Sequence, residues 1–327
     1  MSRENQRPGV FLAGCLTALL AVVAPAAYGT GGLPRQAGRL SVLSYNVAGL
    51  PLGLSGARPA RDSRLISPLL NEVDLVLVQE DFGYHEALVS QDTHPYRSPK
   101  DRRRSPLLLP LGSGLQRLSS LAFEKLQHVR WQKCAGIFWG GSDCLAPKGF
   151  SVARHALPSG HVIDVYNLHA DAKDEAPDKA ARRIQLRQLA GFIEAYSRDR
   201  AVLVVGDTNS RYTRRGDILP ELLRRAQLRD VWLELERSGE LPKLGRKLDG
   251  CRLDPSEGSC EQVDKIFFRD GGGVTLTPLA YRVESQRFRT ADGQPLSDHE
   301  PVFALFGYRL TGEPSLQTVS HGAVTMR

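Results

Sequence analysis

The apolar residues of this chain are concentrated in short runs that end at polar residues. Continuously apolar runs such as Leu75–Val78 and Ala201–Val205 are typical of β-strands that are buried on both faces. Polar residues at the ends of rigid strands gather at one rim, where functional sites are commonly found. The predicted strands are Leu40–Tyr45, Leu75–Val78, Val162–Leu168, Ala201–Val205, Val263–Phe268 and Pro301–Phe306.

Segments with helical periodicity lie between these runs. Asp178–Ser197 carries Leu186 and Leu189 at helical spacing and arginines on its other faces. This pattern predicts a surface helix that packs one apolar stripe on a sheet. Shorter helices are expected at Arg61–Asn71 and Leu219–Leu228.

The composition is that of an ordinary globular protein. The 43 Lys and Arg residues against 36 Asp and Glu give a net charge of +7, and 41% of the 327 positions are hydrophobic. The 31 glycines and 20 prolines show no period, so disorder, a collagen-like repeat and a coiled coil are excluded. We expect one catalytic domain at residues 38–310, followed by a tail at 311–327.

Residues 1–29 have the layout of a secretory signal peptide. Arg3 and Arg7 lie in a polar start, and a mostly apolar run then extends from Val10 to Ala24, as in signal peptides. A membrane anchor is the alternative, although the run is shorter than the ~20 apolar residues that a spanning helix needs. The mature protein is therefore expected to be secreted or periplasmic, and to be a soluble monomer.

Four of the five cysteines lie outside this leader and form two close pairs. Cys134 lies near Cys144, and Cys251 lies near Cys260. Three connectivities are possible, and the short separations together with an oxidising compartment favour two local disulfides. A zinc site made by all four thiolates is the alternative, but its ligands would be spaced more widely than the about two to four residues of a usual zinc knuckle.

The strand ends carry oxygen ligands and imidazoles but no thiolate. Carboxylates and amides with few nitrogen ligands suit Mg²⁺, Mn²⁺ or Ca²⁺ better than zinc. A hard divalent cation beside histidines suits phosphoester hydrolysis, in which charge gathers on phosphoryl oxygens and water loses a proton. The candidate residues are Asn46, Glu80, Asp207, Asn209 and Asp298, with His169 and His299.

Six short motifs, taken in order along the chain, resemble those of the endonuclease/exonuclease/phosphatase superfamily. The resemblance extends over about residues 40–308. It implies a four-layer α/β sandwich, in which two packed mixed β-sheets are flanked by helices and a metal-dependent phosphoesterase site lies along one rim. The motifs are Ser44-Tyr45-Asn46, Val78-Gln79-Glu80, Asn167-Leu168-His169, Gly206-Asp207-Thr208-Asn209, Val263-Asp264-Lys265-Ile266 and Ser297-Asp298-His299-Glu300-Pro301.

The resemblance also implies roles for single residues around a Mg²⁺ ion. Glu80 would be a direct ligand, with Asn46 as its neighbour on the metal. Asp298 would help to complete the metal environment. Asp207 and Asn209 would orient water and phosphate.

Two histidines would carry the proton transfers. His299 would be the general base, held in one tautomer by Asp264. His169 would donate to a phosphoryl oxygen or to the leaving group. The order of the motifs does not decide which histidine is the base, so both assignments stay open.

The segment Cys134–Phe150 resembles the stretch of secreted bacterial sphingomyelinases in which a loop with Cys and Asp leads into Lys-Gly-Phe. This resemblance implies a phosphodiesterase that acts on phospholipid head groups, similar to a sphingomyelinase or phospholipase C. Lys148 would then contact a phosphate oxygen, or it is an exposed lysine at the start of a hairpin. Arg211 and Tyr212 follow Asn209 closely enough to bind a second phosphate or a head group, or they belong to a salt-bridged segment instead.

Two segments, Ile137–Trp139 and Leu107–Leu111, combine apolar side chains with loop-forming surroundings. They would give transient contact with a membrane surface, or they cover a minor core. A secreted Mg²⁺-dependent endonuclease acting on nucleic acid is the alternative function, supported by the positive charge and by Arg102–Arg104. A non-catalytic binding module on the same fold is disfavoured, because neither histidine nor the glutamate is missing.

Overall fold

The computed structural model describes residues 37–50, 58–104, 111–136, 143–157, 160–246 and 260–312. The expected leader at 1–29 lies outside the described residues, as do most of the expected tail, the apolar segment 137–139 and most of 107–111. Within the described residues, no helix is both long enough and apolar enough to cross a bilayer.

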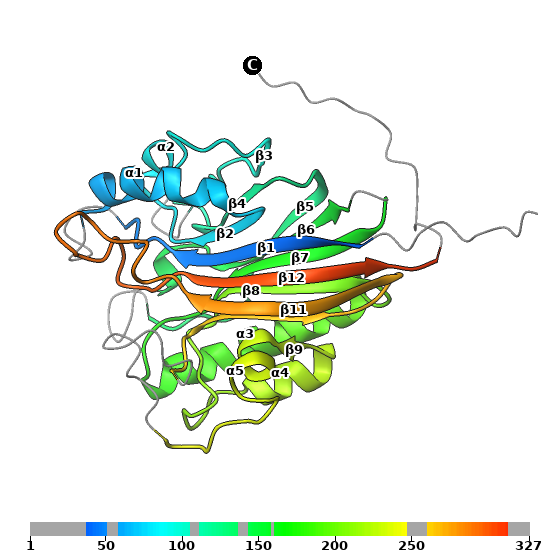
Figure 1. Ribbon diagram of the computed structural model, residues 1–327. Helices are drawn as coiled ribbons and strands as arrows, with labels where there is room; N and C mark the ends of the chain where they lie inside the picture. The colour runs from blue at the N-terminus through cyan, green and yellow to red at the C-terminus, as the bar shows by residue number, and fades with distance from the viewer. Residues whose placement is uncertain are drawn as a thin grey trace, which may run out of the picture. The chain divides into compact units, whose positions relative to one another are not determined.

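Two mixed six-stranded β-sheets pack face to face in the described part of the chain (Figure 1). The first sheet has the order β11 (Val274–Val283), β12 (Val302–Leu310), β1 (Ala37–Asn46), β2 (Leu75–Gln79), β4 (Gln116–Ser119) and β3 (Tyr96–Arg97). The second has the order β5 (Phe123–Arg130), β6 (Gly149–Ala156), β7 (Val162–His169), β8 (Ala201–Asp207), β10 (Asp264–Arg269) and β9 (Arg229–Asp230). In each sheet, one parallel pair, β1 with β2 and β7 with β8, lies among antiparallel neighbours.

Helices cover the outer face of each sheet (Figure 1). The first sheet is covered by α1 (Pro59–Leu69), the 3₁₀ turn η1 (Leu70–Glu72) and α2 (His85–Leu88). The second is covered by α3 (Ala176–Tyr196), α4 (Leu219–Ala226) and α5 (Val231–Glu236), and a further 3₁₀ turn, η2, spans Asp143–Leu145. The four-layer α/β sandwich expected from the sequence is therefore confirmed.

Strand β8 shows why these runs are continuously apolar. Leu203 and Val205 lie in the core between the sheets, whereas Val202 and Val204 lie in the core beneath the helices. Both faces of the strand are buried, so apolar residues are needed at every position. The strand continues beyond its predicted end through Gly206, where a Cβ atom would lie 2.2 Å from the carbonyl oxygen of Leu168 on β7.

Helix α3 begins two residues before its predicted start at Asp178. Glu175 and Asp178 form a reciprocal capping box, in which the Glu175 N–H donates to Asp178 Oδ2 at 3.0 Å. Pro177 lies in the first turn, where its missing N–H costs no helical hydrogen bond. Local capping therefore places the helix start earlier than the apolar stripe alone indicates.

One of the two predicted local disulfides is confirmed, because Cys134 and Cys144 are bonded with an S–S distance of 2.00 Å. Their sulfurs are therefore not thiolate ligands, which excludes the alternative of a four-thiolate zinc site. The second predicted pair includes Cys251, which lies outside the described residues.

A fully buried amide connects the two sheets directly below the rim. Asn167, on β7 of the second sheet, donates from Nδ2 to the Val78 carbonyl of β2 at 2.9 Å and to the Gln116 carbonyl of β4 at 3.0 Å. Its Oδ1 accepts from Nε2 of Gln79 at 2.8 Å. Buried polar groups must find such partners, so these bonds fix how the first sheet lies against the second.

Replacing Asn167 with alanine would remove three buried hydrogen bonds. Gln79 Nε2 would keep its bond to the Leu77 carbonyl. A buried polar group left without a partner costs about 1–3 kcal/mol, so we expect Asn167→Ala to lower the free energy of unfolding by at least about 3 kcal/mol in urea denaturation. Asn71→Ala is the control, because its side chain bonds only at an exposed site; it should lose less than about 1 kcal/mol. Similar losses in both variants would contradict the proposed importance of the bridge.

Candidate active site

Polar side chains from both sheets meet where several strands begin or end. Asn46 ends β1 and His169 ends β7, while Asp207 ends β8 and Asp264 begins β10. In the sheet register, Asp207 lies directly between His169 and Asp264 on the neighbouring strands. His299 belongs to the segment before β12, which lies beside β1 in the first sheet.

Glu80 follows β2 in an unusual backbone conformation. Its φ angle is +59°, a left-handed conformation that costs a non-glycine residue roughly 1–3 kcal/mol and is concentrated at functional sites. The Glu80 carbonyl accepts from the N–H groups of Gly49 at 3.1 Å and Phe82 at 2.8 Å. A side chain at Gly49 would crowd this carbonyl, since a Cβ atom there would lie 2.5 Å from it. The backbone around Glu80 is therefore held in place from both sides.

Asn46 connects carboxylates that come from different sheets. Its Nδ2 donates to Glu80 Oε1 and to Asp207 Oδ2, both at 3.2 Å, and its Oδ1 accepts from the Ala48 N–H at 3.1 Å. Asn46 and Asp207 are fully buried. Burial raises the pKa of Asp207 to about 6, because the ionised carboxylate loses its contact with water.

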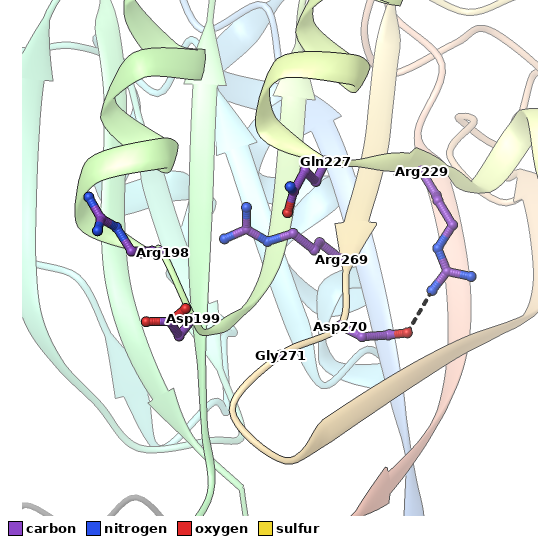
Figure 2. Close-up of a pocket in the computed structure, with 7 residues that line it drawn as sticks. All are labelled: Arg198, Asp199, Gln227, Arg229, Arg269, Asp270 and Gly271. Carbon is purple, nitrogen blue, oxygen red and sulfur yellow. Dashed lines mark hydrogen bonds and ion pairs between the residues drawn. The ribbon is translucent and has the colours of Figure 1, made fainter.

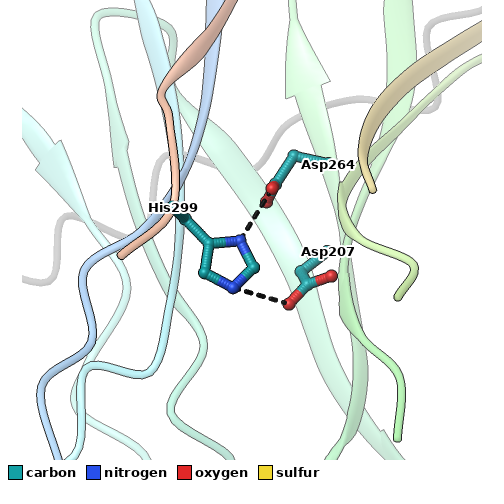
Figure 3. Close-up of side chains that lie close together, drawn as sticks. All are labelled: Asp207, Asp264 and His299. Atoms are coloured by element: carbon teal, nitrogen blue, oxygen red, sulfur yellow. Dashed lines mark hydrogen bonds and ion pairs between the residues drawn. The ribbon is translucent and has the colours of Figure 1, made fainter. Parts of the chain in front are cut away.

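His299 lies against two carboxylates of the second sheet (Figure 3). Its Nδ1 is 2.8 Å from Asp264 Oδ2, and its Nε2 is 3.8 Å from Asp207 Oδ2. Burial opposes a charge on the ring, but the carboxylates of Asp264 and Asp207 outweigh it and raise the pKa of His299 to about 10. Ser297 Oγ accepts from the His299 N–H at 3.2 Å and donates to the Asn46 carbonyl at 2.7 Å, which ties the histidine segment to β1.

His169 is more deeply buried and has a basic neighbour. Its Nε2 lies 3.4 Å from Asp207 Oδ2, 3.8 Å from Glu80 Oε1 and 3.1 Å from Lys148 Nζ. Burial and the charge of Lys148 hold the pKa of His169 well below its usual range, so this ring is neutral. The surroundings of His299 therefore favour a proton on its ring, whereas those of the more deeply buried His169 disfavour one.

Lys148 lies inside the site. The alternative that it is an exposed lysine at the start of a hairpin is therefore wrong. It is only 9% exposed, and its Nζ lies 2.5 Å from Asp143 Oδ1. Burial lowers the pKa of Lys148, but the carboxylate of Asp143 more than compensates and raises it above the ordinary value. A charged ammonium group is thus available beside His169.

The other predicted residues lie at different distances from this centre. Asn209 belongs to it, because its Nδ2 donates to Asp207 Oδ2 at 3.0 Å. Asp298 is an exposed neighbour of His299. The Arg211 side chain donates to the Glu261 carbonyl.

Tyr212 is buried in the core between the second sheet and its helices. Its hydroxyl donates to Asp230 Oδ2 at 2.7 Å, and its ring stacks on Trp232 with centroids 6.2 Å apart. Substrate binding by Tyr212 stays a prediction, and this placement does not favour it.

Sequence reasoning gave no role to Asp143, Gln79 or Asn167. Gln79 and Asn167 belong to the quoted motifs, and Asp143 lies five residues before Lys148. Gln79 and Asn167 contact residues distant in sequence, so spacing carried no signal for their roles. Asp143 pairs with Lys148 only five residues away, and this short spacing is the signal that could have identified it.

The donor set of the rim fits a hard divalent cation. Glu80 and Asp207 offer carboxylate oxygens on either side of one amide, and Asp298 is adjacent to the histidine segment. One ligand atom each from Asp207, Asp264 and His299 also lie within 4.8 Å of one another. Oxygen donors and buried, incompletely compensated negative charge are the chemistry that Mg²⁺ prefers.

A pocket of about 460 Å³ lies at the other end of the second sheet, at the ends of β10 and α3 (Figure 2). Its buried arginine, Arg269, donates to the carbonyls of Ala226 at 2.8 Å and Ser197 at 2.5 Å. These carbonyls end α4 and follow α3, so Arg269 stabilises two helix C-termini. The pocket is lined by Arg198, Asp199, Gln227, Arg229, Arg269, Asp270 and Gly271 and is separate from the rim site.

Comparison with known proteins gives one family. Residues 118–305 match the family described as Endonuclease/Exonuclease/phosphatase family 2. The chain is 34% identical over 275 residues to a sphingomyelinase of Mycobacterium tuberculosis, covering 83% of this chain and 53% of that protein. The chain thus spans about half the length of this relative.

Two solved structures share the fold. Sphingomyelinase C from Streptomyces griseocarneus matches with a TM-score of 0.56 and 22% identity, covering 82% of this chain and 99% of that one. A beta toxin of Staphylococcus aureus with bound magnesium ions matches with a TM-score of 0.57 and 18% identity, with coverage of 82% and 99%. Likeness at these identities establishes the architecture alone.

Proposed function

Because this chain belongs to the endonuclease/exonuclease/phosphatase family 2, we propose that it is a divalent-metal-dependent phosphodiesterase that hydrolyses phospholipid head groups, as a sphingomyelinase does. The observation that carries the proposal is the meeting of Glu80, Asp207 and His299 at one rim. The head-group substrate is supported by the name of the mycobacterial relative.

Glu80 would hold Mg²⁺, with Asn46 as its neighbour on the metal, and Asp298 would help to complete its surroundings. When bound, the cation neutralises the carboxylates around it and stabilises negative charge on the phosphoryl oxygens as a Lewis acid. Mn²⁺ or Ca²⁺ would suit the same oxygen donors.

We assign His299 as the general base. The carboxylates of Asp264 and Asp207 raise its pKa in the metal-free protein, and a cation beside Asp207 would offset part of their charge and favour the neutral ring that a base requires. Asp264 binds the Nδ1 atom of His299 and so fixes the tautomer in which Nε2 carries the lone pair when the ring is neutral. This side chain is 20% exposed, whereas the His169 side chain is 1% exposed, so a water molecule reaches His299 more readily. Asp207 and Asn209 would orient that water and the phosphate.

His169 and Lys148 would act on the phosphate. The Lys148 ammonium group can only donate, so His169 Nε2 accepts from Nζ at 3.1 Å and would hold this positive charge beside the phosphate. Preorganised donors and charges of this kind stabilise the negative charge that develops in the transition state.

Secretion, a monomeric state and transient membrane contact remain predictions of the same proposal. A disulfide between Cys134 and Cys144 is consistent with an oxidising compartment, since such bonds are rare in the cytosol.

Metal binding can be tested without measuring activity. Mg²⁺ at about 100 times its dissociation constant should stabilise the fold by roughly 2.7 kcal/mol, seen as a rise in Tm that a chelator reverses. Glu80→Gln should lose most of this rise, because it removes a ligand charge. Glu240→Gln, at an exposed position, should keep it. An equal rise in wild type and Glu80→Gln would exclude Glu80 as a ligand.

Activity tests the proposed substrate and base. With Mg²⁺, the wild-type protein should release phosphocholine from sphingomyelin vesicles, and His299→Ala should lower kcat at least about 100-fold, within the range that general bases contribute. His128→Gln, on edge strand β5, serves as the histidine control and should keep kcat. Plasmid DNA and an inositol phosphate are offered in parallel, and a clear preference for DNA would favour the endonuclease alternative instead.

A further inference from the structure

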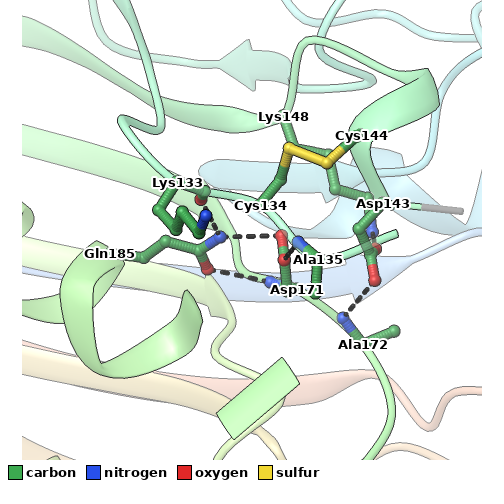
Figure 4. The surroundings of a disulfide bond; sticks show 9 residues. All are labelled: Lys133, Cys134, Ala135, Asp143, Cys144, Lys148, Asp171, Ala172 and Gln185. Carbon is green, nitrogen blue, oxygen red and sulfur yellow. Dashed lines mark hydrogen bonds and ion pairs between the residues drawn. A yellow bond between two sulfur atoms is a disulfide. The ribbon is translucent and has the colours of Figure 1, made fainter. Parts of the chain in front are cut away.

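The Cys134–Cys144 disulfide lies beside the chain segment that follows His169 (Figure 4). The residue after Cys134 and the residue before Cys144 both form hydrogen bonds to this segment. Ala135 binds it on one side of the bridge, and Asp143 binds it on the other. The disulfide therefore covalently links the residues that make these two contacts.

The contact beside Cys134 is centred on Asp171, which is fully buried. Asp171 Oδ2 accepts from the Ala135 N–H at 2.5 Å, and Oδ1 accepts from Gln185 Nε2 at 2.7 Å. The same Gln185 nitrogen donates to the Lys133 carbonyl at 2.8 Å. Water cannot readily replace these bonds at a buried site, so they anchor residues 133–135 to the segment after β7.

The contact beside Cys144 reaches the catalytic rim. Asp143 accepts from the Ala172 N–H at 3.1 Å through Oδ2, and from Lys148 Nζ at 2.5 Å through Oδ1. Lys148 Nζ in turn lies 3.1 Å from His169 Nε2. Asp143 thus joins the disulfide to the lysine and histidine that face the phosphate in the proposed reaction.

We propose that the Cys134–Cys144 disulfide and Asp171 are positioning elements that together hold Lys148 against His169, so that catalysis requires the oxidised bridge. This inference rests on the proposed phosphodiesterase function. Asp171 anchors one end of the bridge, and the covalent bond transfers that anchoring to Asp143 at the other end. Without the covalent bond, the two ends are joined by the hydrogen bond from the Cys144 N–H to the Gly136 carbonyl at 3.2 Å. Asp143 then keeps its own contacts but is less firmly fixed, and so is its partner Lys148.

Reduction by a dithiol breaks the Sγ–Sγ bond. Two electrons and two protons pass to the cysteines, which become thiols, and the dithiol is oxidised to its own disulfide. Because a displacement of about 1 Å at a catalytic group can cost about 100-fold in rate, the loss should appear in kcat.

The test compares oxidised wild type with dithiothreitol-reduced wild type, with Cys134→Ser/Cys144→Ser and with Asp171→Asn, which keeps the bridge. Hydrolysis of soluble bis(4-nitrophenyl) phosphate is measured with Mg²⁺, below the Tm of every protein. We expect kcat of the reduced protein and of the double variant to fall at least about 10-fold, with KM changed less than about threefold. Asp171→Asn should show a smaller fall in kcat. Unchanged kcat after complete reduction would overturn the inference.

Leu276→Ala separates positioning from lost stability. Leu276 lies in the core between the sheets, on β11, so its truncation lowers Tm without touching the disulfide segment. It should keep the wild-type kcat. An equal loss of kcat in Leu276→Ala and the double variant would show a general stability effect and contradict the inference.

A spectroscopic readout distinguishes this inference from the proposed function. In NMR spectra, reduction should shift the ring resonances of His169 and leave those of His94, which is bound between Asp92 and the Val73 carbonyl. If oxidised wild type cleaves no phosphodiester, the proposed function fails while this shift still reports on the positioning. Unmoved His169 resonances would overturn the inference.

Discussion

The buried side chain of Asn167 is the constraint on which the rest of the site depends. Apolar contacts alone define the alignment of two packed sheets less sharply than hydrogen bonds do, because the hydrophobic effect is not directional. Hydrogen bonds from Asn167 to Val78 and Gln116 fix this alignment. A second buried hydrogen bond, from Arg117 of β4 to the Val165 carbonyl of β7 at 3.0 Å, supports it. Glu80 and His169 lie two residues beyond Val78 and Asn167, so the bridge also sets how these two side chains face each other.

Above this bridge, the site concentrates negative charge that the protein itself compensates only in part. Asp207 is buried among Asn46, Asn209 and two histidines. Burial raises the pKa of Asp207, and the carboxylates of Asp264 and Asp207 raise the pKa of His299 against the opposing effect of burial. Buried, partly compensated carboxylates lower the stability of the fold, and they also form a binding site suited to a cation. Functional sites commonly carry such a cost in stability.

The lysine side of the site is built differently. Lys148 does not rely on solvent to support its charge, because Asp143 does so within a segment closed by a disulfide. In the proposed function, the rim would combine a metal-binding half, carried by strand ends, with a phosphate-binding half that contains Lys148. The ends of the strands position the first half, and in our proposal the cross-link holds Asp143 for the second.

Much of this arrangement was predictable from the sequence, and the reasons differ between residues. Apolar runs revealed β1, β2, β7, β8, β10 and β12, because both faces of strands such as β8 are buried, and strand ends then located Glu80, Asp207 and His299. The other six described strands were not predicted from such runs; β5, for example, is exposed or half-buried throughout and carries no apolar run. The early start of α3 depends on capping by Glu175, which the apolar stripe does not report. Tyr212 follows Asn209 in sequence but turns into the core, where Asp230 binds its hydroxyl. Glu80 adopts its positive φ, and Asn167 meets its partners, only when segments distant in sequence pack together. No local sequence pattern predicts either feature.

The most direct measurement of the central claim is the fate of solvent oxygen. Sphingomyelin is hydrolysed in ¹⁸O-labelled water with Mg²⁺, and both products are analysed by mass spectrometry. If the rim directs water onto phosphorus, the label enters phosphocholine and the lipid alcohol stays unlabelled. Label in the lipid alcohol, or no cleavage of sphingomyelin by metal-loaded protein, would contradict the account.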